Sequence, residues 1–283
     1  TIPDGVRLAA LGVPGHPGVS RGAPVETAFT PDGRYAYVSN YWMEGAGFSH
    51  PGDDVCDPSG GYDDSYVYRV DVARRRIDQA IRVGATPKYV AVTPDARRVL
   101  VANWCSYTLS VIDARRHRQV RELYLGAYPR GIAITPGGTR AYVAVMGSTD
   151  IAYVDLRTYR VRWIRDVGSA PRHLVLSPTA RYLYATLNGD GQVIRIDLRT
   201  NRVTGRVTTG SQPRSMAIAP DGRALYVVNY ASGTVSKVRT RDLRVLQAVR
   251  TDEHPIGITY DVATRRVWVA CYSGSLMGFS DAR

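Results

Sequence analysis

The stretch PRSMAIAPDGRALYVVNY, residues 213–230, decides the fold of this protein. Ser215–Ala219 alternates like a β-strand, Pro220–Gly222 has the residues of a tight turn, and Ala224–Asn229 is rich in strand-forming residues. Near-copies of the same unit begin at Pro24, Pro87, Pro129, Pro171 and Pro255. The chain is therefore built from six repeats of one supersecondary unit.

The spacing of the repeats predicts the architecture. The prolines at positions 87, 129, 171, 213 and 255 are each 42 residues apart. The first step, from Pro24 to Pro87, is longer by 21 residues, and we place the insertion at residues 42–65. A period of this length with four strands in each repeat is typical of a propeller blade. We predict an all-β, six-bladed β-propeller with four antiparallel strands per blade, forming one domain over residues 1–283.

The second predicted strand of each repeat carries a recurring tetrapeptide. It reads YVVN at Tyr226–Asn229 and YVSN at Tyr37–Asn40, with weaker forms in the other repeats. Together with the preceding PDG turn and the following TVSxV strand, this pattern resembles the YVTN β-propeller repeat family over nearly the whole chain. The resemblance implies a propeller fold. It implies no particular activity, because the family is a scaffold with many uses.

The two ends of the chain predict how a ring of blades would close. Residues 6–12, VRLAALG, match the fourth strand of later repeats, such as VRELYLG at 120–126. Residues 275–280, SLMGFS, match a third strand, so the last repeat lacks a fourth. We expect the N-terminal strand to pair with the last blade and leave no open edge.

The formal net charge is +12. Much of the basic charge is arginine in recurring hairpin turns, such as Asp113–Arg118 and Asp197–Arg202. A propeller distributes such turns around its outer edge, which favours a solvated basic rim; a weak affinity for anionic polymers is the alternative. No specific nucleic-acid recognition is expected. No run of 18 apolar residues occurs, so no transmembrane segment is predicted, and we expect a monomer.

Three cysteines bear on the compartment. Cys56 lies in the insertion, and Cys105 lies in the corresponding loop of the next repeat, which would be its neighbour in a propeller. A Cys56–Cys105 disulfide is therefore expected and would favour a secreted or cell-surface protein. Cys271 replaces the asparagine of the tetrapeptide and is expected to be a buried free thiol.

The innermost predicted strands place a set of polar residues at one mouth of the central channel. These residues are Glu26, Tyr89, His173 and Ser215, at equivalent positions of their repeats. Repeat order sets Glu26 opposite His173 and Tyr89 opposite Ser215. Such a set suits acid–base catalysis or a single metal ion. The alternative is a structural plug, in which these groups bond to one another and to ordered water.

Two further sets surround that mouth. The residue after the repeat proline is basic in four consecutive repeats, at Lys88, Arg130, Arg172 and Arg214. The residue after the tetrapeptide is aromatic in four repeats, at Tyr41, Trp104, Tyr230 and Tyr272. Cations beside aromatic rings suit an anionic, partly planar ligand. Ordinary packing between blades is the alternative.

A metal cofactor is an open possibility. The insertion contains His50 and several acidic residues: Asp53, Asp54, Asp57, Asp63 and Asp64. With their glycines they could wrap Ca²⁺, although the spacing matches no EF-hand and such loops are commonly just solvated. Calcium-dependent hydrolases with six blades hold the metal on converging acids and amides. Here Glu26 is the single mouth carboxylate, with Asn40, Asn103 and Asn229 as helpers, so that activity is not favoured. The cofactor stays unknown, with Ca²⁺ or Mg²⁺ as the candidates.

Two functions of different classes are consistent with these residues. The first is an exported propeller that binds a small anionic, partly aromatic ligand in the mouth funnel. It could carry metal-assisted lyase or isomerase chemistry on Glu26 and His173. The second is a secreted or cell-surface scaffold that binds a protein or a polymer on that face without catalysis. No nucleophile elbow, phosphate-binding glycine loop or HExxH motif occurs, so the sequence does not establish an enzyme.

Overall fold

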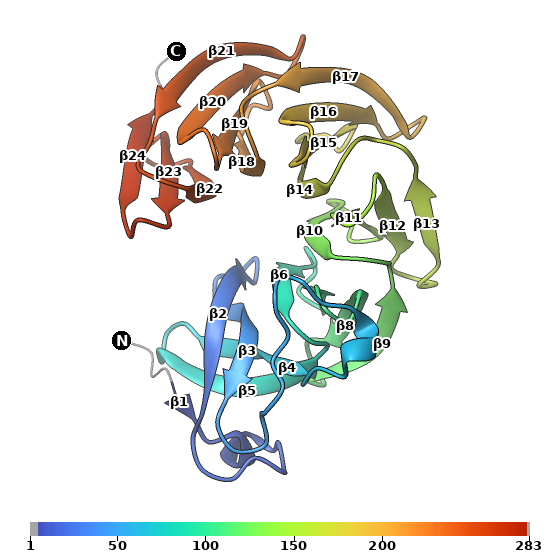
Figure 1. The fold of residues 1–283 in the computed structure, drawn as a ribbon, viewed down its shortest axis with the longest axis vertical. Helices are drawn as coiled ribbons and strands as arrows, with labels where there is room; N and C mark the ends of the chain where they lie inside the picture. Colours follow the sequence, from blue (N-terminus) through green and yellow to red (C-terminus); the bar gives the residue numbers. More distant parts are fainter. Residues whose placement is uncertain (1–4, 282–283) are drawn as a thin grey trace. The chain divides into compact units, whose positions relative to one another are not determined.

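The computed structural model describes residues 5–281, which form six antiparallel sheets that follow one another along the chain (Figure 1). In every sheet the strands are added in sequence order, so each strand pairs with the next one along the chain. Each sheet corresponds to one repeat of the sequence. The predicted fold class, a six-bladed β-propeller, is confirmed.

The first three sheets contain thirteen of the strands. The first has β1 (Gly5–Val6), β2 (Ser20–Phe29), β3 (Tyr35–Glu44), β4 (Ser65–Asp71) and β5 (Arg76–Val83). The second has β6 (Pro87–Val92), β7 (Arg98–Asn103), β8 (Thr108–Asp113) and β9 (Arg118–Tyr124). The third has β10 (Pro129–Ile134), β11 (Arg140–Val145), β12 (Ile151–Asp155) and β13 (Val161–Ile164).

The other three sheets complete the described residues. The fourth has β14 (Pro171–Leu176), β15 (Tyr182–Leu187), β16 (Gln192–Asp197) and β17 (Arg202–Thr208). The fifth has β18 (Pro213–Ile218), β19 (Ala224–Asn229), β20 (Thr234–Arg239) and β21 (Arg244–Arg250). The sixth has β22 (Pro255–Asp261), β23 (Arg266–Cys271) and β24 (Leu276–Ser280). Two short 3-10 helices are η1 (Leu8–Leu11) and η2 (Pro58–Gly60).

The chain divides into two compact units within the third sheet. The first unit comprises the residues up to 143 together with 154–161. The second comprises 144–153 together with the residues from 162 onward. In the first unit, Tyr37, Val67, Val90 and Ile112 are buried together and join the first sheet to the second. This packing of apolar sheet faces is the main stabilising contribution expected for a propeller.

The second unit is built in the same way. One buried cluster joins the fourth sheet to the fifth through Tyr184, Met216 and Val227. Another joins the fifth sheet to the sixth through Val228 and Val269 and includes Cys271, which is free and buried as expected. The repeat therefore places equivalent apolar residues against the neighbouring sheet in both units.

The backbone repeats as regularly as the sequence. The residue before the repeat proline has a left-handed conformation, with φ of 52–61°, at Thr86, Tyr128, Ala170, Gln212 and His254. The strand register then shifts at the proline, for example between Pro213 and Ser215. Proline has no N–H to donate to the ladder, and a bulge accommodates this loss. The bulge also takes the intervening residue, Arg214, out of the regular strand pairing.

The predicted role of residues 6–12 is wrong. In the described residues, β1 pairs with β2 of the first sheet, and Leu8–Leu11 is a 3-10 helix rather than part of a strand. The sixth sheet has three strands, as expected, but residues 6–12 do not supply its fourth. The reason is that the Leu8 side chain is fully buried against Met43, Tyr66 and Tyr68 of the first sheet. Gly12, at φ 79°, ends the helix.

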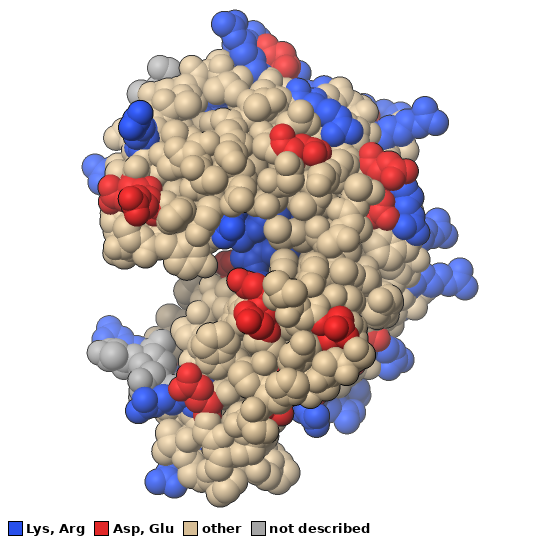
Figure 2. Space-filling model, in the orientation of Figure 1, with Lys and Arg blue, Asp and Glu red and all other residues tan. Residues whose placement is uncertain are grey.

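The insertion lies between β3 and β4, as predicted. The Cys56–Cys105 disulfide is also confirmed and ties the insertion to the loop after β7 of the second sheet. Among the described residues, no helix has the length and apolar character needed to cross a membrane. In the face that Figure 2 shows, Lys and Arg stand out in small groups, and Asp or Glu lies beside several of them.

Candidate functional site

A buried lysine of the first unit has the surroundings of an anion site. Lys88 follows the repeat proline on β6, and its side chain is only 9% exposed. The ammonium lies 3.9 Å from the ring centroid of Trp104 and 4.9 Å from that of Tyr41. A cation stripped of water and facing two ring systems attracts any available carboxylate strongly. The structure brings together these three residues, which the sequence analysis named as possible ligand contacts.

A residue of the insertion supplies that carboxylate. Asp54 accepts hydrogen bonds from the Lys88 ammonium and from the Tyr41 hydroxyl, the latter at 2.7 Å. The indole N–H of Trp104 donates to the Asp54 backbone oxygen at 3.1 Å. The Asp54 side chain itself is 74% exposed. An exposed loop residue therefore inserts its carboxylate at the rim of a buried cation–aromatic site.

The charges of the site shift two pKa values in opposite directions. Burial opposes ionisation of the Asp54 carboxyl and by itself would raise its pKa. The hydrogen bonds from Lys88 and Tyr41, together with the positive charges of Lys88 and Arg130, outweigh burial, so the pKa of Asp54 is lowered. Burial, the hydrogen bond to Asp54 and that negative charge raise the pKa of Tyr41. Asp54 is therefore ionised and Tyr41 neutral at neutral pH. The pair contributes stability above the unfolded carboxyl pKa and loses it as the pH falls through the lowered value.

The insertion is held over the site by covalent and polar contacts. The disulfide joins Cys56, two residues after Asp54, to Cys105, which directly follows Trp104. The hydroxyls of Tyr107 and Tyr128 donate to the Cys56 backbone oxygen at 2.7 and 2.9 Å. These restraints keep the Asp54 carboxylate close to the Lys88 ammonium.

Sequence reasoning missed the part that Tyr128 plays here. Its ring is stacked on Trp104 with centroids 4.5 Å apart. The sequence could have indicated this role, because Tyr128 directly precedes the repeat proline, as His254 does in the last repeat.

Glu26, Tyr89 and Arg130 share an electrostatic environment in the first unit. Burial and the negative charge of Glu26 raise the pKa of Tyr89, and the positive charge of Arg130 opposes this shift. All three side chains are partly buried. The predicted pairings of Glu26 with His173 and of Tyr89 with Ser215 stay predictions.

The second unit contains an equivalent of the Lys88 site. The Arg214 guanidinium lies 3.5 Å from the ring centroid of Tyr230, which occupies the same repeat position as Trp104. Tyr230 is stacked on His254 with centroids 4.5 Å apart, and Tyr272 packs edge-on against it at 5.9 Å. The Tyr272 side chain is 67% exposed. The predicted Arg214, Tyr230 and Tyr272 therefore come together, and the stacked His254 was missed.

The backbone oxygen of Arg214 accepts a hydrogen bond, whereas one nitrogen of its side chain has no acceptor among the described residues. Arg172 is buried and donates from its guanidinium to the Arg214 backbone oxygen at 2.5 Å. A terminal nitrogen of Arg214 donates to the Gln212 side chain at 3.3 Å. The Arg214 Nε is buried, and no described residue accepts a hydrogen bond from it. An unsatisfied buried donor on a cation favours binding of an anion.

The three tetrapeptide asparagines are buried inside the sheets. Asn103 donates from its amide to Thr108 and Ser110, and Asn229 donates to Thr234 and Ser236 in the same pattern. Asn40 donates to the Tyr66 backbone oxygen at 2.8 Å. A Cβ added to Gly210 would lie 2.7 Å from Asn229 Cγ, so a glycine is needed for this close approach. These contacts give the asparagine amides a structural role between strands.

The acidic residues of the insertion do not converge on one point. Asp57 binds Ser59, Asp63 accepts the backbone N–H groups of Ser49 and His50, and Asp64 pairs with Arg82 at 2.8 Å. Within residues 5–281, no group of three or more His, Cys, Asp or Glu side chains is placed to hold a metal ion. The calcium hypothesis therefore gains no support from the arrangement of these side chains.

The six antiparallel sheets define a β-propeller repeat protein, and comparisons with known proteins agree on the fold. The sequence model of the cytochrome D1 heme domain family matches residues 167–271, which is less than half of the chain. No curated protein matches the sequence. The likeness to the YVTN family remains a resemblance.

Three solved structures illustrate the likeness of fold. A chain of hydrazine synthase from Kuenenia stuttgartiensis is 20% identical with a TM-score of 0.60, covering 92% of this chain and 96% of that one. A candidate 6-phosphogluconolactonase from Bacteroides uniformis is 18% identical with a TM-score of 0.73, covering 91% and 81%. A chain of the mitotic checkpoint complex is 13% identical with a TM-score of 0.76, covering 91% and 74%. At these identities the likeness concerns the fold alone.

The region that matches the heme domain model contains two histidines, His173 and His254. A haem iron requires an axial ligand such as a histidine nitrogen. His173 Nδ1 accepts the backbone N–H of Met216 at 3.4 Å. Cys271 is buried in the core, and His254 has its ring face against Tyr230. The same region offers a cation beside aromatic rings, at Arg214 and Tyr230.

Proposed function

We propose that this protein is an exported β-propeller that binds a small anionic, partly aromatic ligand at the pair formed by Arg214 and Tyr230. The ligand's carboxylate would accept hydrogen bonds from the Arg214 guanidinium, including its buried Nε. Its planar part would lie against Tyr272 and His254, which border Tyr230. Catalysis is not part of this proposal.

One observation carries the proposal: the equivalent pair in the second repeat already holds a carboxylate. Lys88 and Trp104 occupy the repeat positions of Arg214 and Tyr230, and Asp54 is bound there by the chain's own insertion. The fifth repeat has no insertion, so its pair lacks such an internal carboxylate in the described residues. Asp54 therefore serves as an internal example of the ligand chemistry that the Arg214 site would accept.

The ligand class can be inferred from the groups at the site. Arginine binds carboxylates in a planar, two-point manner and stacks on aromatic faces. Tyr272 is mostly exposed beside the pair, so a planar ring can reach it. The match of residues 167–271 to a heme domain model supports a planar molecule with acidic groups, such as a tetrapyrrole. The disulfide supports an oxidising compartment, as expected for an exported protein.

The test uses metal-free protoporphyrin IX and its dimethyl ester, which differ only in their acidic groups. We expect the acid to bind the purified protein and the ester to bind far more weakly, because the ester cannot accept charge-assisted hydrogen bonds from Arg214. Titrations followed by porphyrin fluorescence measure both affinities. Equal binding of the two compounds would indicate unspecific adsorption through the ring and would contradict the proposal.

The substitution Asp54→Asn tests the internal carboxylate. Removing its charge weakens the contact with Lys88, so we expect a second porphyrin molecule to bind per chain at the Lys88–Trp104 pair. The stoichiometry from the same titration checks this. Because the Asp54 pKa is lowered, the wild-type carboxylate stays ionised between pH 5.5 and 8, and the difference between the variant and wild type should be constant over that range. An unchanged stoichiometry would mean that the carboxylate does not occlude the pair.

A further inference from the structure

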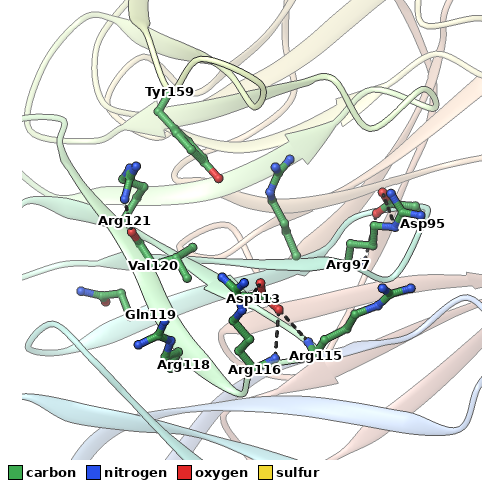
Figure 3. A pocket seen from close by; sticks show the side chains of 11 residues that line it. Asp95, Arg97, Asp113, Arg115, Arg116, Arg118, Gln119, Val120, Arg121 and Tyr159 are labelled. Carbon is green, nitrogen blue, oxygen red and sulfur yellow. Dashed lines mark hydrogen bonds and ion pairs between the residues drawn. The ribbon is translucent and has the colours of Figure 1, made fainter.

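A groove in the first unit gathers arginines from different parts of the chain. It has a volume of about 720 Å³, and Figure 3 shows the side chains that line it. Six arginines line it, against two aspartates: Arg97, Arg98, Arg115, Arg116, Arg118 and Arg121. The sequence suggested hairpin turns spread around an outer edge, whereas the folded unit places three arginines of one such turn, Arg115, Arg116 and Arg118, around one space with three further arginines.

The groove is built from turns of two neighbouring repeats. Arg97 belongs to the turn between β6 and β7, and Arg115 and Arg116 belong to the turn between β8 and β9. The opposite wall comes from Tyr159, in the turn between β12 and β13. Figure 3 shows Tyr159 across the groove from Arg116.

The two aspartates accept hydrogen bonds from backbone N–H groups of their own turns. Asp113 accepts the backbone N–H groups of Arg115 and Arg116, both at 2.9 Å, and these bonds lower its pKa. Asp95 accepts the backbone N–H of Arg97 at 3.0 Å. Their ion pairs with the Arg116 and Arg97 guanidiniums are long, at 3.9 Å each. The aspartates therefore shape the turns and neutralise the groove only in part.

The cations of the groove are available and partly ordered. Among the described residues, the guanidiniums of Arg115 and Arg118 contact no carboxylate and no ring. Arg98 and Arg121 both pack on the Tyr159 ring, with guanidinium carbons 5.5 and 5.4 Å from its centroid. Two arginines are thus held in place by one ring while two others are left for a ligand.

We propose that this groove binds an acidic oligosaccharide, one whose sugar units carry sulfate or carboxylate groups. Several guanidiniums around one open space match repeated anionic groups on a chain, each of which an arginine can bind by two hydrogen bonds. Single-stranded nucleic acid is less suited, because bases need an aromatic face on which to stack and the Tyr159 ring is occupied by Arg98 and Arg121. An exported protein also meets acidic glycans at cell surfaces. This site shares no residue with the Arg214 site, and it uses only the exported location from the proposed function.

The test compares two double variants that remove the same charge from equivalent turns. The double variant Arg115→Ala with Arg118→Ala removes the two groove arginines whose guanidiniums contact no carboxylate and no ring among the described residues. Arg199→Ala with Arg202→Ala removes the matching residues of the fourth repeat, which follow Asp197 as Arg115 and Arg118 follow Asp113. All four side chains are exposed, so both variants should retain the wild-type melting temperature. The probes are sulfated heparin oligosaccharides, oligogalacturonate, neutral dextran and single-stranded DNA.

We expect the groove variant to bind at least one of the acidic oligosaccharides about tenfold more weakly than wild type, a loss that two exposed charge contacts can produce. The matched variant should bind as wild type does, and dextran should not bind. Comparing heparin with oligogalacturonate distinguishes sulfate from carboxylate as the preferred group, and binding should weaken as salt is raised. An equal loss of affinity in both variants would mean that binding depends on the net charge of the protein rather than on the groove, and would overturn the proposal. A preference for DNA over both glycans, or an unaffected groove variant, would overturn it as well.

Discussion

Replacing Cys56 and Cys105 together by serine is expected to lower the free energy of unfolding by about 4 kcal/mol, the chain-entropy value for a loop of this length. The two residues are 49 positions apart, so the disulfide closes a long loop in the unfolded chain. The loss should lower the thermal midpoint by about 10 °C in a protein of this size. Thermal unfolding without reductant measures it.

Wild-type protein in reductant is the matched control for this prediction. Reduction should bring the wild type down to the double variant and leave the variant itself unchanged. The Tyr107 and Tyr128 hydrogen bonds to the Cys56 backbone still hold the insertion in part, so the folded variant should keep its sheets and be cut faster by protease within residues 45–64. Identical melting of the oxidised wild type and the variant would show that the bond adds no stability.

Replacing Arg214 by alanine is expected to weaken porphyrin binding by about 1.5–3 kcal/mol, the range for a hydrogen bond to a charged group. This corresponds to a loss of roughly 10- to 150-fold in affinity. The physical reason is that Arg214 would supply both the charge and the buried Nε donor to the ligand's carboxylate. The same fluorescence titration measures the loss.

Two further variants sharpen the result for Arg214. Arg214→Lys keeps the charge but loses the planar stack on Tyr230, so it should restore only part of the affinity. Arg250→Ala removes an exposed arginine of the same sheet and should bind as wild type does. If Arg250→Ala weakened binding as much as Arg214→Ala, the ligand would be held by general positive charge rather than at this pair.

The sequence by itself determined the repeat and the features that depend directly on it. Strands are added in chain order, so each repeat's proline, turn and tetrapeptide specify one sheet through contacts between neighbours in sequence. The same equivalence of repeats predicted the Cys56–Cys105 bond and the pairing of cations with rings at Lys88 and Arg214. Predicting these features required only the rule that equivalent positions of the sequence repeats lie at equivalent places in their sheets.

Only the tertiary structure decided the features that break the repeat or combine several turns. Residues 6–12 carry the apolar pattern of a fourth strand, but such a pattern does not specify which strand it pairs with. In the folded protein Leu8 is buried against the first sheet, and residues 8–11 form a 3-10 helix. The insertion has no counterpart in other repeats, so nothing in the pattern indicated that Asp54 would reach Lys88. The arginine groove depends on how side chains from separate turns lean toward one space, and this orientation is set by packing rather than by the period.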